Sequence, residues 1–373
     1  MNDQKHHLDQ KAQWMYEESI EHGITPSFGI FNLGSIAVGA EIDVVRLLKY
    51  KEELPNVTVN GWIHYGQGLY FQTGSEFGLK HILDTGFRGS FLVNYEDRPS
   101  EHFYGLGNHS SDGDQSVFQM EQTTLEAKTG YDFSPIYNNN LFFGFQNVNI
   151  GGGHDGKLGQ IQGHPTFTSE VVPGLHGDEM IYMGSDISRD TRDHRENSKV
   201  GSLERFAFSY REGLEDSNAK FFKYQLELAK YISLWSDRRV MAFRLYGENN
   251  NEISNGHVPF YQMARLGGFG DYPHDSKTLR GYDYNRFFDD SLIVANLEYR
   301  YNVWQYRAFK GDAVLFLDEG QVFHEMRKFK FNDFRESYGL GFRVSVADVT
   351  ILSMEFAHGD EGSNVYVKSN SPF

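Results

Sequence analysis

Cysteine is absent from this chain of 373 residues, and so is any long apolar segment. Without cysteine the chain forms no disulfide bond, and it lacks the thiolate ligands that structural zinc sites commonly use. No apolar run approaches the roughly 18 residues that a membrane-spanning helix requires. No N-terminal apolar segment is typical of a secretory signal, so for an exported protein we expect the signal to have been removed before Met1.

Basic residues are scarce beside acidic ones, with 35 Lys and Arg against 51 Asp and Glu and a net charge of −16. This balance argues against nucleic acid as a partner, because phosphate binding requires clustered Lys and Arg. Tryptophan is also rare (4 residues), whereas Phe (31), Tyr (22) and Gly (39) are plentiful. Such a composition suits a membrane β-barrel with aromatic girdles and glycine-rich turns. It suits a soluble β-sandwich or propeller equally well.

Apolar and polar residues alternate along several segments, most clearly from Ser291 to Val303. The odd-numbered positions there carry mainly apolar or aromatic side chains, and the positions between them include Glu298 and Arg300. Because successive side chains of a strand point to opposite faces, the pattern predicts a strand with one apolar and one charged face. Several runs reach the length of a tilted membrane strand, about 9–11 residues, whereas soluble strands average about 5–6.

We therefore predict an all-β fold, a transmembrane antiparallel β-barrel of sixteen strands, because a sheet in lipid must close on itself. The pattern of residues 3–22 predicts a short helix, which Gly23 and Pro26 would end. This helix would lie at the barrel mouth or belong to a leader. The predicted organisation is a short N-terminal helix or leader at residues 1–25 and an outer-membrane barrel at residues 26–373. The predicted strands are 34–47, 56–66, 68–80, 84–96, 115–132, 140–151, 179–189, 199–213, 218–234, 238–249, 258–270, 290–304, 309–323, 335–347, 348–359 and 363–373.

Short motifs follow one another in a distinctive order in the C-terminal part. In chain order they are Gly267-Gly268, Arg280-Gly281-Tyr282, Phe316-Leu317-Asp318-Glu319-Gly320 and the terminal Phe373. Two upstream segments, Phe103 to Asn108 and Asp190 to Asp193, belong to the same ordered set of motifs. The whole order resembles the bacterial surface antigen family of BamA/TamA-like outer-membrane barrels, and the resemblance spans roughly residues 26 to 373.

The resemblance implies sixteen strands and a sixth extracellular loop that folds back into the lumen, with the Arg-Gly-aromatic motif at its tip. It implies that Arg280 pairs with Asp318 and that Phe373 is a C-terminal insertion signal. Glu298 is a second acidic candidate, because it lies on the polar face of its predicted strand. The planar guanidinium of arginine presents paired N–H donors that match the two oxygens of a carboxylate. The alternative is a turn glycine beside a solvated arginine.

Glycines in these motifs predict close approach between the loop and the barrel wall. Gly281 lets the chain turn sharply next to Arg280, and Tyr282 follows it. Gly267, Gly268 and Gly320 would leave room for the loop to approach the wall.

Nothing in the sequence indicates catalysis or a bound cofactor. The 15 histidines are scattered, and neither a His-Glu-x-x-His zinc motif nor a Gly-x-Ser-x-Gly nucleophile motif occurs. Asp112 and Asp114 lack the other ligands of a calcium loop, and His154-Asp155 reads as part of a flexible loop. We therefore expect no enzyme activity, no metal site and no cofactor.

The favoured function is insertion or translocation of protein or lipid at the outer membrane of a Gram-negative bacterium, through a weak barrel seam and a loop held in the lumen. The partners expected are outer-membrane lipid, an unfolded outer-membrane or secreted protein as client, and a second copy in a homodimer. With about 25 residues ahead of the barrel, we expect a member without POTRA or patatin domains. The alternatives are a passive pore or structural barrel, and a soluble all-β binding protein or enzyme.

Overall fold

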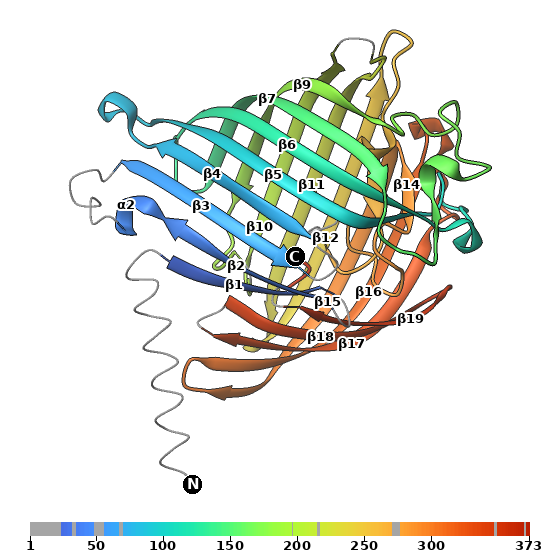
Figure 1. The fold of residues 1–373 in the computed structure, drawn as a ribbon. Coiled ribbons are helices and arrows are strands. Elements are labelled where there is room, and N and C mark those ends of the chain that lie inside the picture. Colours follow the sequence, from blue (N-terminus) through green and yellow to red (C-terminus); the bar gives the residue numbers. More distant parts are fainter. Residues whose placement is uncertain are drawn as a thin grey trace.

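The computed structural model describes residues 24–31, 35–47, 56–66, 70–195, 197–214, 217–270, 277–346, 349–368 and 371–373. Most of these residues lie in strands, which are connected by turns and loops (Figure 1). Among the described residues, none of the helices has the length and apolar character needed to span a membrane. The helices are α2 (Val44–Leu47) and the 3-10 turns η2 (Ile82–Asp84), η3 (Asp112–Asp114), η4 (Ile161–Gly163), η5 (Phe260–Gln262) and η6 (Met326–Lys328).

The main sheet contains 17 strands, of which the two-residue β8 (Gly159–Gln160) is a parallel attachment to β6. The other sixteen form an antiparallel series in which each strand pairs with the next in the chain, as predicted. They are β1 (Ile24–Phe31), β2 (Ser35–Asp43), β3 (Val57–Gly66), β4 (Phe71–Leu79), β5 (Phe87–Phe103), β6 (Ser116–Tyr131), β7 (Tyr137–Gly152), β9 (Gly177–Asp190), β10 (Gly201–Gly213), β11 (Lys220–Leu234), β12 (Ser236–Glu252), β15 (Ser291–Tyr306), β16 (Phe309–Phe323), β17 (Arg335–Val346), β18 (Val349–Gly359) and β19 (Gly362–Lys368).

The sheet curls into a barrel, so that its first and last strands meet at a seam (Figure 1). Cα atoms of β1 and β19 approach within 8 Å of one another. Over the described residues, however, no ladder of backbone hydrogen bonds joins these two strands, whereas β1 is paired with β2 along its whole length. The seam is therefore the one junction between neighbouring strands of the described wall that lacks the ladder found at the others.

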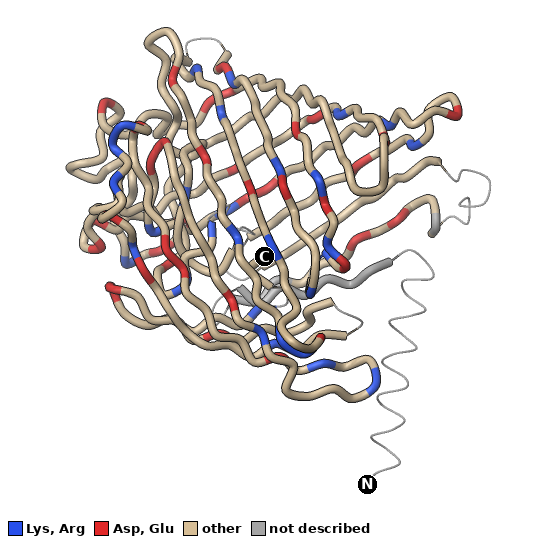
Figure 2. The backbone as a smooth tube through the Cα atoms, turned by 180° about the vertical axis from the view of Figure 1, so that it is seen from behind, with Lys and Arg blue, Asp and Glu red and all other residues tan. Residues whose placement is uncertain are grey.

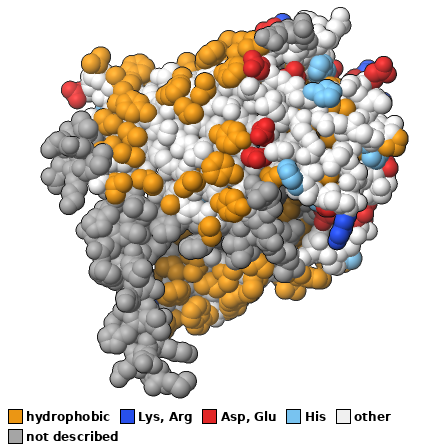
Figure 3. All heavy atoms as spheres, viewed as in Figure 1, with side chains coloured by type: hydrophobic (Ala, Val, Ile, Leu, Met, Phe, Trp, Pro, Cys, Tyr) orange, Lys and Arg blue, Asp and Glu red, His pale blue; other side chains and the backbone are white. Residues whose placement is uncertain are grey.

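The alternation of the sequence separates an outer apolar face from an inner polar one. On β15, Leu297 is 40% exposed on the outside, whereas the next residue, Glu298, is fully buried on the inside. Hydrophobic side chains are spread over the visible outer surface (Figure 3). Charged residues occur along the strands as well as in the loops (Figure 2). This is the arrangement expected of strands that face lipid on one side and a polar lumen on the other.

Two of the predicted elements need correction. The predicted strand 258–270 is wrong, because this stretch belongs to a loop and its apolar residues are all buried, with Val258 and Phe269 at 0% exposure. Such residues fill an interior and do not alternate between lipid and lumen. The first strand is instead β1, which was not predicted because Pro26 was read only as the end of a helix. Proline is tolerated in a strand at a sheet edge, and β1 occupies one.

The predicted N-terminal helix at residues 3–22 lies outside the described residues, and so does most of the predicted leader. The last two residues of that leader, Ile24 and Thr25, belong to β1. The two errors in the strand list compensate, so that β12 is the eleventh strand of the barrel and β15 the twelfth. The long connection between them, residues 253–290, is therefore the sixth loop at its end of the barrel and is called loop 6 below.

Candidate functional site

Loop 6 folds back inside the barrel and contacts the inner wall. Within it, β13 (Ala264–Leu266) pairs with β14 (Phe287–Asp289) in a short antiparallel ladder. The loop packs into three clusters of buried apolar residues. These include Val258, Phe260, Tyr261, Met263 and Phe288 in the first, Ala264, Leu266, Leu279, Tyr282 and Phe287 in the second, and Phe269 and Tyr284 in the third. This packing holds the described parts of the loop in one position against the wall.

Arg280, near the tip of the loop, is fully buried and binds the carboxylate of Asp318 on β16 through two hydrogen bonds. Its Nε and Nη2 atoms donate to the two carboxylate oxygens at 2.7 Å each. The backbone N–H of Arg280 donates to the same carboxylate at 3.2 Å. The guanidinium also lies over the ring of Phe316, 3.5 Å from its centre. The fork geometry fixes both the position and the orientation of the loop tip.

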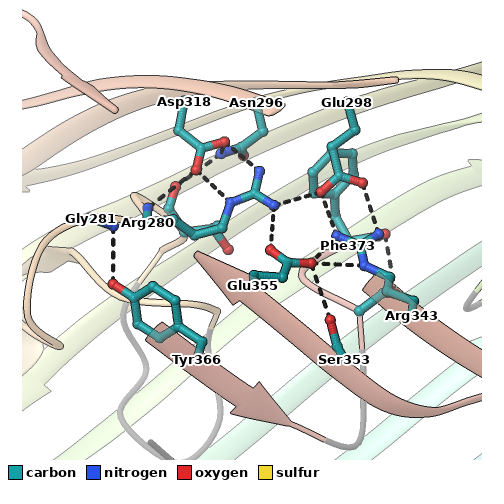
Figure 4. A network of polar contacts seen from close by, with 12 residues as sticks. Arg280, Gly281, Asn296, Glu298, Asp318, Arg343, Ser353, Glu355, Tyr366 and Phe373 are labelled. Carbon is teal, nitrogen blue, oxygen red and sulfur yellow. Dashed lines mark hydrogen bonds and ion pairs between the residues drawn. The ribbon is translucent and has the colours of Figure 1, made fainter. Parts of the chain in front are cut away.

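Two further acids surround the same guanidinium (Figure 4). The Nη1 atom of Arg280 donates to Glu298 of β15 at 2.7 Å and to Glu355 of β18 at 2.8 Å. Both carboxylates are in turn bound by Arg343 of β17, and Arg300 of β15 donates to Glu298 at 2.7 Å. The network thus contains three arginines and three acids, including Asp318, and carries no net charge.

The network crosses the wall from β15 to β18, and the loop reaches β19 through its backbone. The N–H of Gly281 donates to the Tyr366 hydroxyl of β19 at 3.0 Å, and that hydroxyl donates to the carbonyl of Tyr282 at 2.7 Å. The hydroxyl of Tyr282 donates to the backbone of Glu336 at 3.1 Å. Loop 6 therefore contacts each of the last five strands of the barrel.

Gly281 and Gly320 show why the contact needs glycine. Gly281 has φ +91°, and a Cβ there would lie 2.9 Å from the backbone nitrogen of Gly359. Gly320, on the wall, would place a Cβ 2.9 Å from Leu266 of the loop. The predicted Gly267 and Gly268 also have positive φ and lie against residues 283–286 of loop 6 itself. Their close approach is thus within the loop, whereas Gly320 borders the wall.

Sequence reasoning missed Arg343 and Glu355, which complete the network. It also missed a second attachment of the loop through Arg286, whose guanidinium binds the Glu361 carboxylate through two bonds of 2.7 Å. Arg286 donates as well to the side chain and backbone of Ser110. The alternation of its predicted strand places Arg343 on the polar face, but that pattern alone did not single it out as a partner of the loop. The role of Arg286 depends on how loops pack and has no local signal.

Phe373 lies inside the barrel next to the network around Arg280 (Figure 4), against β11 and against β12, the strand that pairs with β15. Its backbone carbonyl accepts a bond of 3.1 Å from Arg300, and its ring packs against Ala229, Tyr231 and Ala242. In the folded chain this side chain is thus directed to the lumen and not to lipid. Its role as an insertion signal concerns the unfolded chain and stays a prediction.

The fold has counterparts among known proteins. A family model described as Omp85 superfamily domain matches residues 56–361. BamA from Haemophilus ducreyi lacking POTRA domains 1–3 is similar in structure, with a TM-score of 0.63 and 13% identity over 93% of this chain and 69% of that chain. CdiB from Escherichia coli gives a TM-score of 0.57 and 12% identity over 93% of this chain and 62% of that chain.

CdiB from Acinetobacter baumannii is similar to the same degree, with a TM-score of 0.55 and 12% identity over 93% of this chain. Our chain covers 60% of that protein, so it spans less than two thirds of either CdiB chain. No curated protein matches the sequence. At these identities the likeness to solved structures concerns the fold.

Proposed function

The chain belongs to the Omp85 superfamily, and on that premise we propose that it inserts or translocates protein through the seam between β1 and β19. Membership of this superfamily indicates the outer membrane of a Gram-negative bacterium and protein transport there. The client is an unfolded protein that forms β-strands. The observation that carries the proposal is the seam, where neighbouring strands lie within 8 Å but no ladder joins their described residues.

Edge strands in lipid carry backbone groups that have no water to bond, so an unladdered seam is costly. An incoming strand offsets this cost by pairing with one edge. Loop 6 supports such an opening, because the contacts at its tip lie on β15 to β19 and hold one side of the seam in place. Movement of β1 on the other side of the seam leaves these contacts of the loop tip intact.

The test is a disulfide that closes the seam, which is clean because the chain has no native cysteine. Single cysteines along β1 are combined with one at Val365 or Val367 of β19, and the pair that crosslinks is kept. The control pair joins Leu340 of β17 to Phe356 of β18, which are partners in the ladder. All proteins are reconstituted in liposomes, and the folding rate of a urea-denatured outer-membrane protein is measured.

We expect the cysteine-free protein to accelerate client folding over empty liposomes. The seam disulfide should abolish the acceleration, reductant should restore it, and the control disulfide should leave it unchanged. Equal acceleration with an open and a closed seam would contradict the proposal. A protein without acceleration that gives large, steady channels in planar bilayers would be a passive pore.

A further inference from the structure

A second polar cluster lies at the mouth of the barrel, outside the network around Arg280. Asp289 and Asp290 end loop 6, and His324 begins loop 7, the connection of residues 324–334 after β16. One ligand atom from each of the three lies within 4.8 Å of the others. The Nδ1 atom of His324 lies 2.5 Å from the Asp290 carboxylate and 4.0 Å from that of Asp289.

The register of the β15–β16 hairpin brings these residues together. Ser291 is the first residue of β15 and pairs with Phe323, the last residue of β16. The next residues outward, Asp290 and His324, therefore face each other across the mouth of the hairpin. They are far apart in the sequence and belong to no recognisable motif, which is why the sequence predicted no metal site.

Both carboxylates are buried, and His324 is the basic side chain that faces them. Asp290 is 2% exposed and Asp289 8%, and among the described residues neither forms an ion pair with Lys or Arg. The Oδ1 atom of Asp290 has no hydrogen-bond partner within the described part of the chain. A buried carboxylate oxygen without a partner is unfavourable, and a cation would satisfy it.

The backbone around the cluster is held firmly. Asn250 of β12 donates to the carbonyl of Asp290 through both its backbone N–H, at 2.9 Å, and its side chain, at 3.0 Å. The N–H of Asp290 donates to the Asp289 carboxylate at 2.9 Å. Such surrounding contacts orient the ligands of metal sites. The side chain of His324 is 58% exposed, so the cluster is open to solvent on one side.

We propose that Asp289, Asp290 and His324 bind one divalent cation of the Zn²⁺ class, which joins loop 6 to loop 7. One imidazole and two carboxylates with an open fourth position suit Zn²⁺, which takes nitrogen and oxygen ligands in tetrahedral sites. Ca²⁺ takes six to eight oxygen ligands and Mg²⁺ an oxygen octahedron, so the imidazole and the small ligand number disfavour both. Binding requires the exposed His324 to rotate, since tetrahedral ligands lie roughly 3.3 Å apart.

Burial and the facing charges shift the protonation equilibria of all three side chains. Burial raises the pKa of Asp289 to about 6, and burial likewise raises the pKa of Asp290, against the opposing effect of His324. Although its partial burial acts in the other direction, the facing carboxylates raise the pKa of His324. Burial thus favours the protonated carboxylic acids, so protons compete with a cation at this place.

The test is calorimetric titration of the chelator-treated full chain in detergent with ZnCl₂ and, separately, CaCl₂. The variants are His324→Ala and Asp290→Asn. The matched control is His109→Ala, which removes an exposed histidine that pairs with Asp333 at 2.7 Å and belongs to no cluster of three ligands among the described residues. Folding of each variant is checked by heat-dependent migration in electrophoresis.

We expect both cluster variants to bind one Zn²⁺ fewer than the wild type and His109→Ala to bind as many. Any zinc bound elsewhere, for instance by the adjacent His6 and His7, cancels in this difference. Zinc should also raise the Tm of the wild type more than that of His324→Ala. If Asp290→Asn does not fold, the exposed His324→Ala decides alone. Unchanged zinc stoichiometry in His324→Ala, or Ca²⁺ binding there as tightly as Zn²⁺, would overturn the proposal.

Discussion

The two sides of the barrel wall treat their charged residues differently. On β15 to β18, loop 6 covers the inner face, and Glu298, Asp318 and Glu355 are at most 1% exposed. On the opposite side, the ends of β3 to β6 near Arg88 line a cavity of about 310 Å³, away from the ends of β5 and β6 that pack against loop 6 at Phe103 and Phe118. There Arg88 pairs with Asp132 while 21% and 46% of the two side chains remain exposed.

This difference shows that the covering loop, and not the strand pattern, decides how much a charged side chain contributes to the stability of the fold. Both sides have the same alternation, and each has an Arg–Asp pair, although that of Arg88 and Asp132 has one hydrogen bond where that of Arg280 and Asp318 has two between the side chains. Where the loop excludes water, removing one partner leaves a buried charge without compensation, which is strongly destabilising. Where water enters, an ion pair contributes little to the free energy of unfolding. The covered side is therefore held in one conformation. The open side is the one that can change its conformation at low cost in free energy.

The largest expected effect comes from removing an acid on the covered side. Asp318→Ala leaves Arg280 buried without its main partner and should lower the free energy of unfolding by about 3–5 kcal/mol. Asp132→Ala is the matched change on the open side and should cost about 0–1 kcal/mol. Urea unfolding in lipid vesicles measures both. Similar losses for the two variants would remove the distinction between the sides.

A smaller effect is expected from the turn that carries Arg280. Gly281→Ala forces a side chain into a positive φ and against the backbone of Gly359, and should cost about 1–3 kcal/mol. The control is Gly156→Ala in the loop after β7, where an added Cβ meets no atom within 4 Å. That change should stay within about 0.5 kcal/mol. A neutral Gly281→Ala in the same urea assay would show that the loop tip is not tightly seated.

Hydrogen exchange compares the two sides without mutation. Backbone amides of β3 and β4 should exchange faster than those of β16 and β17, because the covered strands open only when loop 6 is released. Each 1.4 kcal/mol difference in opening free energy gives about a tenfold difference in rate. Mass spectrometry of peptides from both sides measures this. In Arg280→Ala the difference should shrink, and equal rates in the wild type would contradict the comparison.

The smallest expected effect is that of salt. Raising the ionic strength screens the exposed pair of Arg88 and Asp132 but hardly reaches the buried network. The loss caused by Asp132→Ala should therefore fall toward zero at high salt, while that of Asp318→Ala should persist. Urea unfolding of both variants at two NaCl concentrations gives the comparison. A strong salt dependence of Asp318→Ala would indicate that water reaches the network.

Much of the architecture followed from the residues alone. The alternation around Glu298 predicted a two-faced strand, and the order of such runs predicted an antiparallel barrel, which the sheet topology confirms. Pattern reasoning failed at residues 258–270 and at Pro26. In the first case buried apolar residues of an inserted loop imitate a strand. In the second, Pro26 can belong to a strand only because that strand lies at the edge of the sheet, which its local sequence does not reveal.

For the site, the motif around Arg280 pointed to Asp318 and Glu298, and the structure places all three together. Glu355 and Arg343 were not named, because their meeting depends on how β17 and β18 pair. The cluster of Asp290 and His324 likewise depends on the register of one hairpin. Neither register nor loop insertion can be read from a single strand.

By itself, the sequence determined which residues face lipid and which face the lumen, because the two-residue period of a strand is a local property of its backbone. The tertiary structure alone decided which inward residues meet and which are covered. Those outcomes depend on strand register, on the curvature of the whole sheet and on the path of loop 6 through the lumen, and these involve residues far apart in the chain.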